Sequence, residues 1–340
     1  MRLASLDDGT RDGLLVIIDA SGRSFARAAG IAPSLQRALD DWARVEPALR
    51  DRAAQLDRGS IRGESLAGVK LTAPLPRAYE WIDGSAYLNH VRLVRRARGA
   101  APPDDLESNP LVYQGGSGVL LGPADPLAWA ADAGLDFEGE IAVVVSDIPR
   151  ATPAHRASEY LKLVMIANDV TYREMVPTEL KKGFGFFVSK PSTAFSPFAI
   201  TLDELGGAFR DGRAFLRLAC TYNGSTVGDL LTGDEMHFSF CDLVAHATTT
   251  RSLVAGTIIG SGTVSNEDAT RGVACLAELR TRETLSFGAP RTPYMKPGDV
   301  IRIEAFDSNG RSVCGAIEQR VTSEQVGAGD CSARGMTPRG

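Results

Sequence analysis

Apolar residues in this chain recur mainly as short runs and as alternations of period two. Residues 14–18 form one apolar run, and a shorter one surrounds Leu3. Residues 164–166 are apolar or β-branched, and residues 300–306 alternate cleanly between apolar and polar side chains. Patterns of this length and period predict a β-strand at each of these places.

Two pairs of such segments are joined by turn residues and predict β-hairpins. Residues 216–222 meet Asn223-Gly224, a dipeptide that favours the two-residue turn of a tight hairpin. The alternating segment 300–306 is followed by the turn-forming residues 307–310 and by a second predicted strand around 313–317.

Helical periodicity is clearest near the N-terminus, where a helix is predicted to begin near Ser34. One stripe of that helix holds Leu35, Ala38, Leu39, Trp42 and Val45. Pro47 is expected to end or kink it, because proline removes a helix hydrogen bond. Shorter helices are predicted at about 153–160 and 240–250. Strands outnumber helices without strand–helix–strand alternation, which favours an α+β, β-rich fold over a doubly wound one.

A chain of 340 residues is typically about two domains. Residues 1–72 form a predicted small N-terminal domain, and the proline-containing stretch 73–76 resembles a linker. The main domain is predicted to cover residues 73–323. Residues 324–340 are Gly-rich and are expected to be a disordered tail.

Composition excludes several classes of function. A formal charge of -5 and a pI near 5.5 predict no nucleic-acid partner. No run reaches the ~18 apolar residues that a membrane span needs, and the early run 14–18 is too short for a signal peptide. The five cysteines are odd in number and form no Cys-x-x-Cys pair, which predicts reduced thiols in a cytoplasmic protein. The glycine-rich runs lack the lysine of a phosphate-binding loop, so nucleotide binding is not predicted.

Carboxylates in segments that should be apolar are the most informative polar residues. Glu138 and Glu140 lie in the predicted strand 136–145, two residues apart, and therefore on one face. An acidic pair of this kind commonly faces water and binds nothing. On a buried face, however, two like charges repel and resist desolvation unless a cation lies between them.

Two further acids favour a metal site. Asp169 follows the mostly apolar run 161–167, where a buried strand would deliver it to the rim of a sheet. Asp83 lies in 81–85, which has the composition of a turn. Three separate segments thus supply oxygen ligands, the donors preferred by Mg²⁺ and Ca²⁺, with Mn²⁺ as a further candidate.

At this point the sequence resembles the fumarylacetoacetate hydrolase family over about residues 76–319. The closest likeness is to its shorter bacterial branch, which is assigned to the breakdown of aromatic amino acids such as tyrosine. The motifs that carry the resemblance, in order, are Phe137-Glu138-Gly139-Glu140, Asn168 to Arg173, Ser189-Lys190-Pro191, Ser196-Pro197, and Gly256-Thr257 leading into Gly260-Ser261-Gly262-Thr263.

The resemblance implies a fold and a set of roles. The fold would be a mixed β-sandwich roll of the fumarylacetoacetase C-terminal type, with a small N-terminal β-barrel-like domain, assembled as a homodimer. The implied metal ligands are Asp83, Glu138, Glu140 and Asp169. His90, seven residues after Asp83, would be the catalytic base, oriented by Glu278. Arg173 and Lys190 would bind the oxyanion or the substrate, and Arg98, Tyr113 and Thr263 would hold the substrate's carboxylate and carbonyl oxygens.

Two positions depart from the family pattern. Val176 stands where the animal enzymes have a glutamine that helps to form the oxyanion site. Ser85 stands where those enzymes have a substrate-binding tyrosine, although Tyr87 is two residues away. Both changes leave the implied metal ligands and base intact, so they concern the identity of the acyl substituent.

The implied activity is that of a metal-dependent hydrolase. It would cleave the carbon–carbon bond of a 1,3-diketone or acylpyruvate-type acid through water activated by His90 and Glu278 and a metal-stabilised enolate. The best single substrate is fumarylacetoacetate, which would give fumarate and acetoacetate. Two alternatives remain open. One is a metal-dependent lyase or isomerase, such as an oxo-acid decarboxylase, hydratase or tautomerase; the other is a non-catalytic descendant of the fold.

Overall fold

The computed structural model describes residues 1–97, 99 and 101–323. Arg98, a predicted substrate-binding residue, and the predicted disordered tail 324–340 lie outside the described residues. The described chain contains no helix long and apolar enough to cross a membrane.

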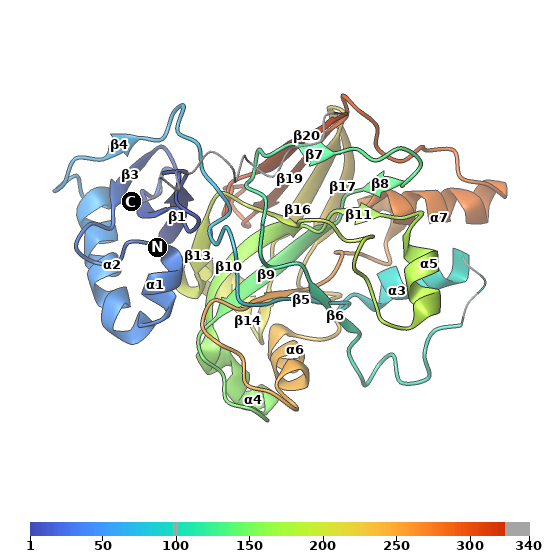
Figure 1. Ribbon diagram of the computed structural model, residues 1–340, viewed down its shortest axis with the longest axis horizontal. Helices are drawn as coiled ribbons and strands as arrows, with labels where there is room; N and C mark the ends of the chain where they lie inside the picture. Colours follow the sequence, from blue (N-terminus) through green and yellow to red (C-terminus); the bar gives the residue numbers. More distant parts are fainter. Residues whose placement is uncertain (98, 100, 324–340) are drawn as a thin grey trace, which may run out of the picture.

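Two β-sheets form the body of the molecule (Figure 1). The larger has eleven strands in the order β4-β3-β2-β1-β13-β10-β9-β18-β5-β6, with β12 paired to β10. Its strands are β1 (Arg2–Leu6), β2 (Leu14–Ile18), β3 (Ser24–Arg27), β4 (Glu64–Ser65), β5 (Trp81–Gly84), β6 (Val112–Gly115), β9 (Gly139–Val145), β10 (Leu161–Asn168), β12 (Ala194–Phe195), β13 (Ala199–Thr201) and β18 (Ile258–Gly260).

The second sheet has five strands in the order β17-β16-β19-β20-β7. These are β7 (Leu127–Ala128), β16 (Arg217–Tyr222), β17 (Ser225–Leu231), β19 (Val300–Phe306) and β20 (Ile317–Thr322). Two small ribbons complete the strands: β8 (Leu135–Asp136) with β11 (Thr171–Tyr172), and β14 (Phe209–Arg210) with β15 (Arg213–Ala214).

Helices cover the ends and one face of this body. They are α1 (Leu35–Leu39), α2 (Trp42–Asp57), α3 (Leu88–Ala97), α4 (Ala154–Ala157), α5 (Val176–Lys182), α6 (Phe240–Ala247) and α7 (Leu276–Phe287). Short 3₁₀ turns lie at Ser158–Tyr160, Leu202–Ala208 and Ala269–Arg271. The predicted α+β, β-rich class is confirmed.

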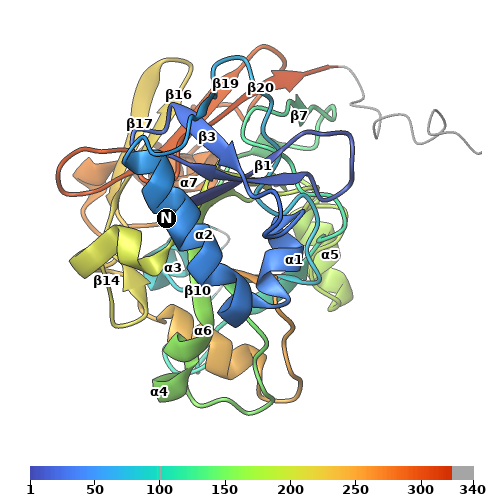
Figure 2. The same ribbon diagram turned by 90° about the vertical axis from the view of Figure 1, so that its left-hand side faces the viewer.

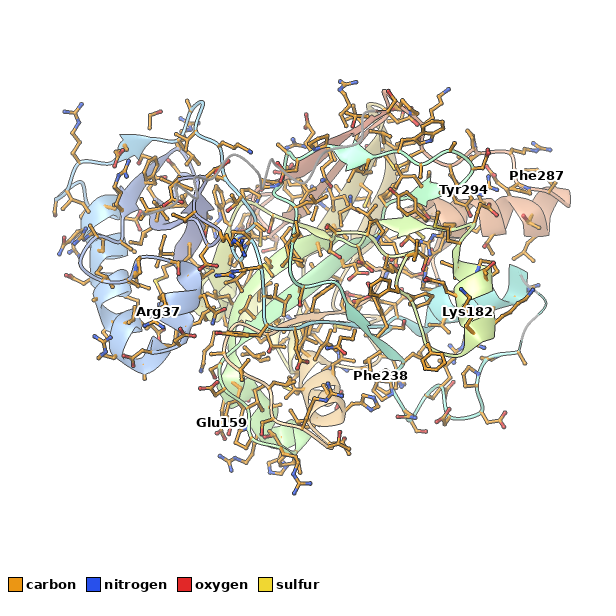
Figure 3. The ribbon with its side chains drawn as sticks, viewed as in Figure 1. Arg37, Glu159, Lys182, Phe238, Phe287 and Tyr294 are labelled. Atoms are coloured by element: carbon orange, nitrogen blue, oxygen red, sulfur yellow. The ribbon has the colours of Figure 1, made fainter. Side chains whose placement is uncertain are left out.

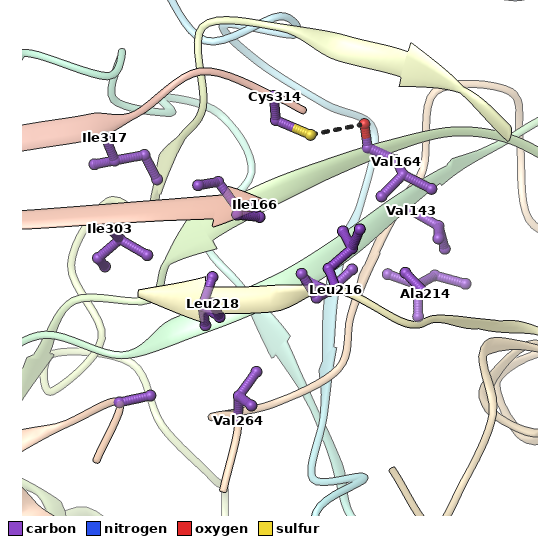
Figure 4. Packing of buried hydrophobic residues seen from close by; sticks show 14 of the residues in the cluster. Val143, Val164, Ile166, Ala214, Leu216, Leu218, Val264, Ile303, Cys314 and Ile317 are labelled. Carbon is purple, nitrogen blue, oxygen red and sulfur yellow. Dashed lines mark hydrogen bonds between the residues drawn. The ribbon is translucent and has the colours of Figure 1, made fainter. Parts of the chain in front are cut away.

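The central strands are buried because both faces of the large sheet are covered. Val164 and Ile166 of β10 pack toward Leu218 of β16 in the second sheet and toward Leu216, which directly precedes that strand, as Figure 4 shows. Met165, which alternates with them, belongs to a second core with residues of α1 and α2. Every residue of β9 is therefore buried, and its sequence reads as a continuous apolar run after Glu140.

The N-terminal strands are part of the same large sheet. β1 pairs with β13 of the main body, while α1 and α2 lie outside the sheet, in front in Figure 2. The division into domains at residue 72 stays a prediction. The link near residues 73–76 is itself well packed, since Ala73 and Leu75 are buried.

Most predicted strands and hairpins are confirmed. β1, β2, β10, β16 and β19 lie where apolar runs or alternation predict them. Asn223 and Gly224 connect β16 to β17 with φ values of 49° and 80°, the conformation that this hairpin turn requires. The predicted helices at 153–160 and 240–250 correspond to α4 with its following 3₁₀ turn and to α6.

Two predicted boundaries are wrong. Pro47 does not end the early helix: the chain breaks after α1, and α2 runs through Pro47 to Asp57, so that only the predicted kink at Pro47 stays a prediction. Burial of Val45, Leu49 and Leu56 on one stripe of α2 offsets the lost hydrogen bond. The partner strand of β19 begins at Ile317 and not near Val313, because Gly315 adopts a φ of 72° against Pro197, where a Cβ would meet the proline ring.

Three helices, α3, α5 and α7, are absent from the prediction. They gather at one end of the molecule, at the right of Figure 1. Lys182 on α5 and Tyr294 beside α7 mark this end in Figure 3. It is also the end at which β5, β9 and β10 bring their acidic residues together.

Candidate metal centre and active site

Three of the four predicted ligands meet in one cluster. Asp83, Glu140 and Asp169, here called the acid triad, are buried, and their carboxylate oxygens lie within 4.8 Å of one another. Asp83 comes from β5, Glu140 from β9, and Asp169 directly follows β10. The expected turn at Asp83 is wrong, because Asp83 pairs with Gly260 of β18 and Tyr113 of β6 as a strand residue.

Strand register explains why these acids converge. Glu140 of β9 lies opposite Ala167 of β10. Ala167 is two residues before Asp169, so the register brings Glu140 close to Asp169. β18 separates β9 from β5, and its residue at this level is Gly260. A Cβ on Gly260 would lie 2.3 Å from Asp83 Oδ1, so the missing side chain gives that carboxylate its place. The backbone N–H of Gly262 also donates to Asp83 Oδ1 at 3.1 Å.

Glu140 has no hydrogen-bond partner within the described chain. Both of its carboxylate oxygens are buried without a donor, although its residue is 0% exposed. Burial and the charge of Asp83 raise the pKa of Glu140 well above its usual range, and burial with the charge of Asp169 does the same for Asp83. A buried acid with no donor is costly, which indicates that a cation belongs here.

Glu138, in contrast to Glu140, is bonded to two cationic side chains. It accepts hydrogen bonds from Arg173 Nη2 at 2.6 Å and from Lys190 Nζ at 2.5 Å, and its ligand atoms are not in the triad's group. Burial alone would raise the pKa of Glu138, but the charges of Arg173 and Lys190 outweigh it and hold that pKa well below its usual range. Glu138 as a metal ligand stays a prediction.

Lys190 connects Glu138 to the triad. Its Nζ also donates to Asp169 Oδ2 at 2.5 Å, and the Tyr113 hydroxyl donates to the same oxygen at 2.7 Å. The other oxygen, Oδ1, accepts from Thr193 Oγ1 at 2.7 Å. Tyr113 thus supports a ligand carboxylate as well as lining the cavity. Thr193 is a supporting residue that the sequence analysis missed.

A second group of residues joins α3 to α7. His90 Nδ1 lies 2.7 Å from Glu278 Oε1, and the Glu278 side chain is fully buried. An ionised carboxylate only accepts hydrogen bonds, so this contact places a proton on Nδ1, and in the neutral ring Nε2 is then the free acceptor. His90 lines a cavity, and its Nε2 has no hydrogen-bond partner among the residues that the structure describes.

Cys275 lies close to this pair but is not a nucleophile. Burial raises the pKa of the Cys275 thiol well above its usual range, and the charge of Asp136 adds to the effect. The sulfur accepts the backbone N–H of Glu278 at 3.4 Å at the start of α7. It therefore acts as a weak helix cap.

The cavity in front of His90 has a volume of about 340 Å³. Its polar lining includes Asp83, Glu138, Arg173, Lys190 and Thr263, and its apolar lining includes Val176 and Phe186. Ser85 lines it as well, so both departures from the family pattern face one cavity. A larger cavity of about 1070 Å³ adjoins it and shares Tyr113, Phe186 and Lys190.

The charge balance fits a divalent cation. The connected acids are Asp83, Asp136, Glu138, Glu140 and Asp169, and the cations bonded to them are Arg173 and Lys190. When all are ionised, five negative charges face two positive ones. An all-oxygen donor set with this excess suits a hard cation such as Mg²⁺, Ca²⁺ or Mn²⁺.

Comparison with known proteins was made for the whole chain. Residues 80–322 match the family described as fumarylacetoacetate (FAA) hydrolase C-terminal, and residues 1–77 match fumarylacetoacetase N-terminal domain 2. A curated relative, oxaloacetate tautomerase YisK from Bacillus subtilis, is 26% identical over 205 residues, which cover 59% of this chain and 64% of that protein.

Two solved structures share the fold at low sequence identity. One is the fumarylacetoacetate hydrolase EaFAH from Exiguobacterium antarcticum, with a TM-score of 0.66 and 20% identity, covering 95% of this chain and 100% of that one. The other is maleylpyruvate hydrolase from Sphingobium sp. SYK-6 in complex with manganese (II) and pyruvate. Its TM-score is 0.63 with 19% identity, covering 95% of this chain and 99% of that one.

Proposed function

The chain belongs to the fumarylacetoacetate hydrolase family, and we propose that it is a metal-dependent hydrolase of a 1,3-diketone or acylpyruvate-type acid. Fumarylacetoacetate, cleaved to fumarate and acetoacetate, is the best single candidate. One observation carries the proposal: the His90–Glu278 pair opens onto the same 340 Å³ cavity as Asp83, Lys190 and Arg173.

The His90–Glu278 pair is suited to activating water. His90 Nε2 takes a proton from a water molecule in the cavity while the water oxygen attacks the acyl carbonyl carbon. Glu278, 2.7 Å from Nδ1, holds the ring in the required tautomer and stabilises the imidazolium that results. The carbon–carbon bond then breaks, and the imidazolium returns its proton to the departing carbon.

Lys190 and Arg173 supply positive charge at the same cavity. Both line it, and both already bind Glu138, so their ammonium and guanidinium groups are held in place before substrate arrives. Fixed donors of this kind stabilise the negative oxygen that forms on attack. Thr263, which is buried and lines the cavity, would orient a carbonyl oxygen.

The acid triad would hold the divalent cation, together with Glu138 if the lysine contact yields. When bound, the ion supplies Lewis-acid polarisation of the substrate's oxygens. The manganese (II) and pyruvate in the Sphingobium hydrolase support a cation of this class and an oxo-acid ligand. We propose Mg²⁺ or Mn²⁺ as the first candidates, with Ca²⁺ next.

The relatives support a second candidate function, isomerisation of an oxo acid, equally well. YisK is named an oxaloacetate tautomerase, and a related fold is a 5-carboxymethyl-2-hydroxymuconate delta-isomerase from Mycobacterium smegmatis. Isomerisation needs a proton moved between carbon and oxygen, which a histidine base next to a cation can also do. Decarboxylation or hydration of an oxo acid belongs to the same group of alternatives.

Product analysis distinguishes these candidates. Purified protein is incubated with fumarylacetoacetate, acylpyruvates and oxaloacetate, with Mn²⁺ or with a chelator, and the products are identified by NMR. Hydrolysis gives two acids and loss of the diketone ultraviolet absorbance. A tautomerase instead speeds keto–enol exchange without breaking a carbon–carbon bond. If metal-loaded wild type and His90→Ala act equally, or neither acts on any oxo acid, the proposal is wrong.

The family also suggests an assembly and a setting. We propose a homodimer that acts in the cytoplasm in the breakdown of an aromatic amino acid such as tyrosine. The native mass of the purified protein tests the dimer. Growth of a deletion strain on tyrosine tests the pathway.

A further inference from the structure

Asp136 occupies a position between the two halves of the candidate site. It lies at the end of β8, two residues before Glu138, and its side chain is 0% exposed. It was not among the residues that the sequence analysis singled out. Its ribbon partner is Thr171 of β11, two residues before Arg173.

The Asp136 carboxylate accepts four hydrogen bonds, which satisfy both oxygens. Oδ1 accepts the backbone N–H groups of Phe137 at 2.9 Å and Leu276 at 2.7 Å. Oδ2 accepts the backbone N–H of Ala277 at 2.9 Å and Arg173 Nε at 2.8 Å. The donors come from three separate segments of the chain.

Two of these donors are the first N–H groups of α7. Such groups have no partner inside their helix, and a negative charge at this end is favourable. The helix's own N-cap residue, Cys275, offers only a sulfur, to the N–H of Glu278. A residue from a distant strand therefore provides the main cap of α7, and Glu278 follows one residue after the capped pair.

The fourth donor leads to the other half of the site. Arg173 donates Nε to Asp136 and Nη2 to Glu138, and Lys190 then joins Glu138 to Asp169. Hydrogen bonds thus run without a break from the first turn of α7 to the acid triad. His90 is bonded to Glu278 within that first turn.

We propose that Asp136 is a positioning residue that fixes Glu278 against His90 and Arg173 against the cavity at the same time. It touches neither the cavity nor the acid triad in the described chain, so it acts through these two residues. The catalytic consequence rests on the proposed function. The effect on His90 does not, because it is a property of the folded protein.

The test compares two buried aspartates. Asp136→Asn keeps the size of the side chain but replaces one acceptor oxygen by a donor. Asp299→Asn is the matched control, because Asp299 is also buried and accepts from Tyr222 Oη, Asn223 Nδ2 and the backbone N–H of Lys296. In the part of the chain that the structure describes, the Asp299 side chain makes no hydrogen bond with α7, Arg173 or His90.

The first readout is independent of activity. The chain has four histidines, and ¹⁵N-labelled side chains report which ring nitrogen carries the proton, with His90→Ala identifying the signal of His90. We expect the Nδ1–H form in wild type and in Asp299→Asn, and a mixture of both tautomers in Asp136→Asn. An unchanged His90 signal in Asp136→Asn, or an equal change in Asp299→Asn, overturns the inference.

The second readout uses turnover where it is found. Asp136→Asn should lower kcat by roughly 10–100-fold with a much smaller change in KM, as loss of a supporting residue does. Added to Glu278→Gln, it should cause a smaller loss than in wild type, because only its effect through Arg173 remains. A loss as large as in wild type would contradict the part of the inference that concerns Glu278.

The remaining outcomes are also decisive. If wild type turns over no oxo acid, the proposed function fails while the tautomer result still judges Asp136. Asp136→Ser, a smaller side chain with one acceptor, replaces Asp136→Asn if the latter does not fold. Should neither fold while Asp299→Asn does, Asp136 is a structural residue only, and the inference is wrong.

Discussion

The acid triad and the His90–Glu278 pair lie at the same end of the molecule but are positioned by different means. The triad is held by strands, whose register places Glu140 opposite Ala167 and Gly260 opposite Asp83. The pair is held by two helices, α3 and α7, which lie far apart in the sequence. Their packing, and not a backbone ladder, sets the distance of 2.7 Å.

The two regions also differ in how their charges are satisfied. Among the described residues, both oxygens of Glu140 lack a hydrogen-bond donor, whereas Glu278 has the imidazole of His90 on Oε1 and lacks a donor only on Oε2. A carboxylate with no donor, next to other carboxylates, is suited to ion binding, and a carboxylate in contact with an imidazole is suited to proton transfer. Ion binding and proton transfer should therefore fail separately when each region is changed.

The largest expected effect is on proton transfer. His90→Ala should lower turnover by roughly 10²- to 10⁴-fold, because the general base is lost. Mn²⁺ affinity, measured by isothermal titration calorimetry, should stay near that of wild type, because His90 is not in the acid triad. A large fall in Mn²⁺ affinity in this variant would show that the two regions are not separate.

Glu140→Gln is the converse change. It keeps the shape of the side chain but removes the negative charge of a carboxylate that has no hydrogen-bond donor among the described residues. Mn²⁺ affinity should fall by at least about 100-fold, the upper end of what loss of a supporting residue causes. The His90 tautomer signal should be unchanged. If affinity is retained, the ion binds elsewhere.

Thr193→Val tests the support of the triad more finely. Thr193 Oγ1 donates to Asp169 Oδ1 at 2.7 Å, so its loss should weaken Mn²⁺ binding by about 10–100-fold. Thr171→Val is the matched control, because the buried Thr171 hydroxyl donates to the backbone carbonyl of Asp169 and not to its carboxylate. Equal losses in the two variants would point to a general packing effect.

Glu179→Gln should have the smallest effect. The Glu179 carboxylate accepts from Ser189 and from the backbone N–H groups of residues 187–189, directly before Lys190. The Ser189 hydroxyl and these N–H groups lower the pKa of Glu179 to about 2. Turnover should fall by no more than about fivefold, as expected for a contact near the surface.

The same glutamate gives a pH dependence with a defined sign. Because its folded pKa lies below the ordinary value near 4.5, the carboxylate stabilises the segment above about pH 4.5, and that stabilisation is lost as pH falls toward 2. Hydrogen exchange at residues 187–189 should therefore speed up on acidification in wild type and change less in Glu179→Gln. An identical pH response in both proteins would contradict this assignment.

The strand-held triad is easier to predict from the sequence than the helix-held His90–Glu278 pair. An acid just before an apolar run identifies Glu140, and an acid just after one identifies Asp169, since burial in a sheet is a local pattern. Asp83 is singled out from its segment, but that segment is misjudged as a turn, because the composition of residues 81–85 does not reveal a partner strand on each side. Gly260 and Thr193 carry no local signal of their roles.

The helices that hold His90 and Glu278 are harder to predict. The buried residues of α7 are Leu276, Glu278 and Thr281, so its inward face has little hydrophobic periodicity. α3 does carry a helical signal that the prediction missed, because its apolar Leu88 and Val91 recur at helical spacing beside several arginines. The Asp136 cap depends on residues 140 positions apart, and no pattern within either segment announces it.

Gly260 has a consequence for sorting homologous proteins. A single codon change that gave it even a methyl group would push into the space now taken by an oxygen of Asp83. A descendant could thus lose its ion while every acidic residue stayed in its alignment column. Glycine at this position is therefore worth checking alongside the acids when homologous sequences are compared.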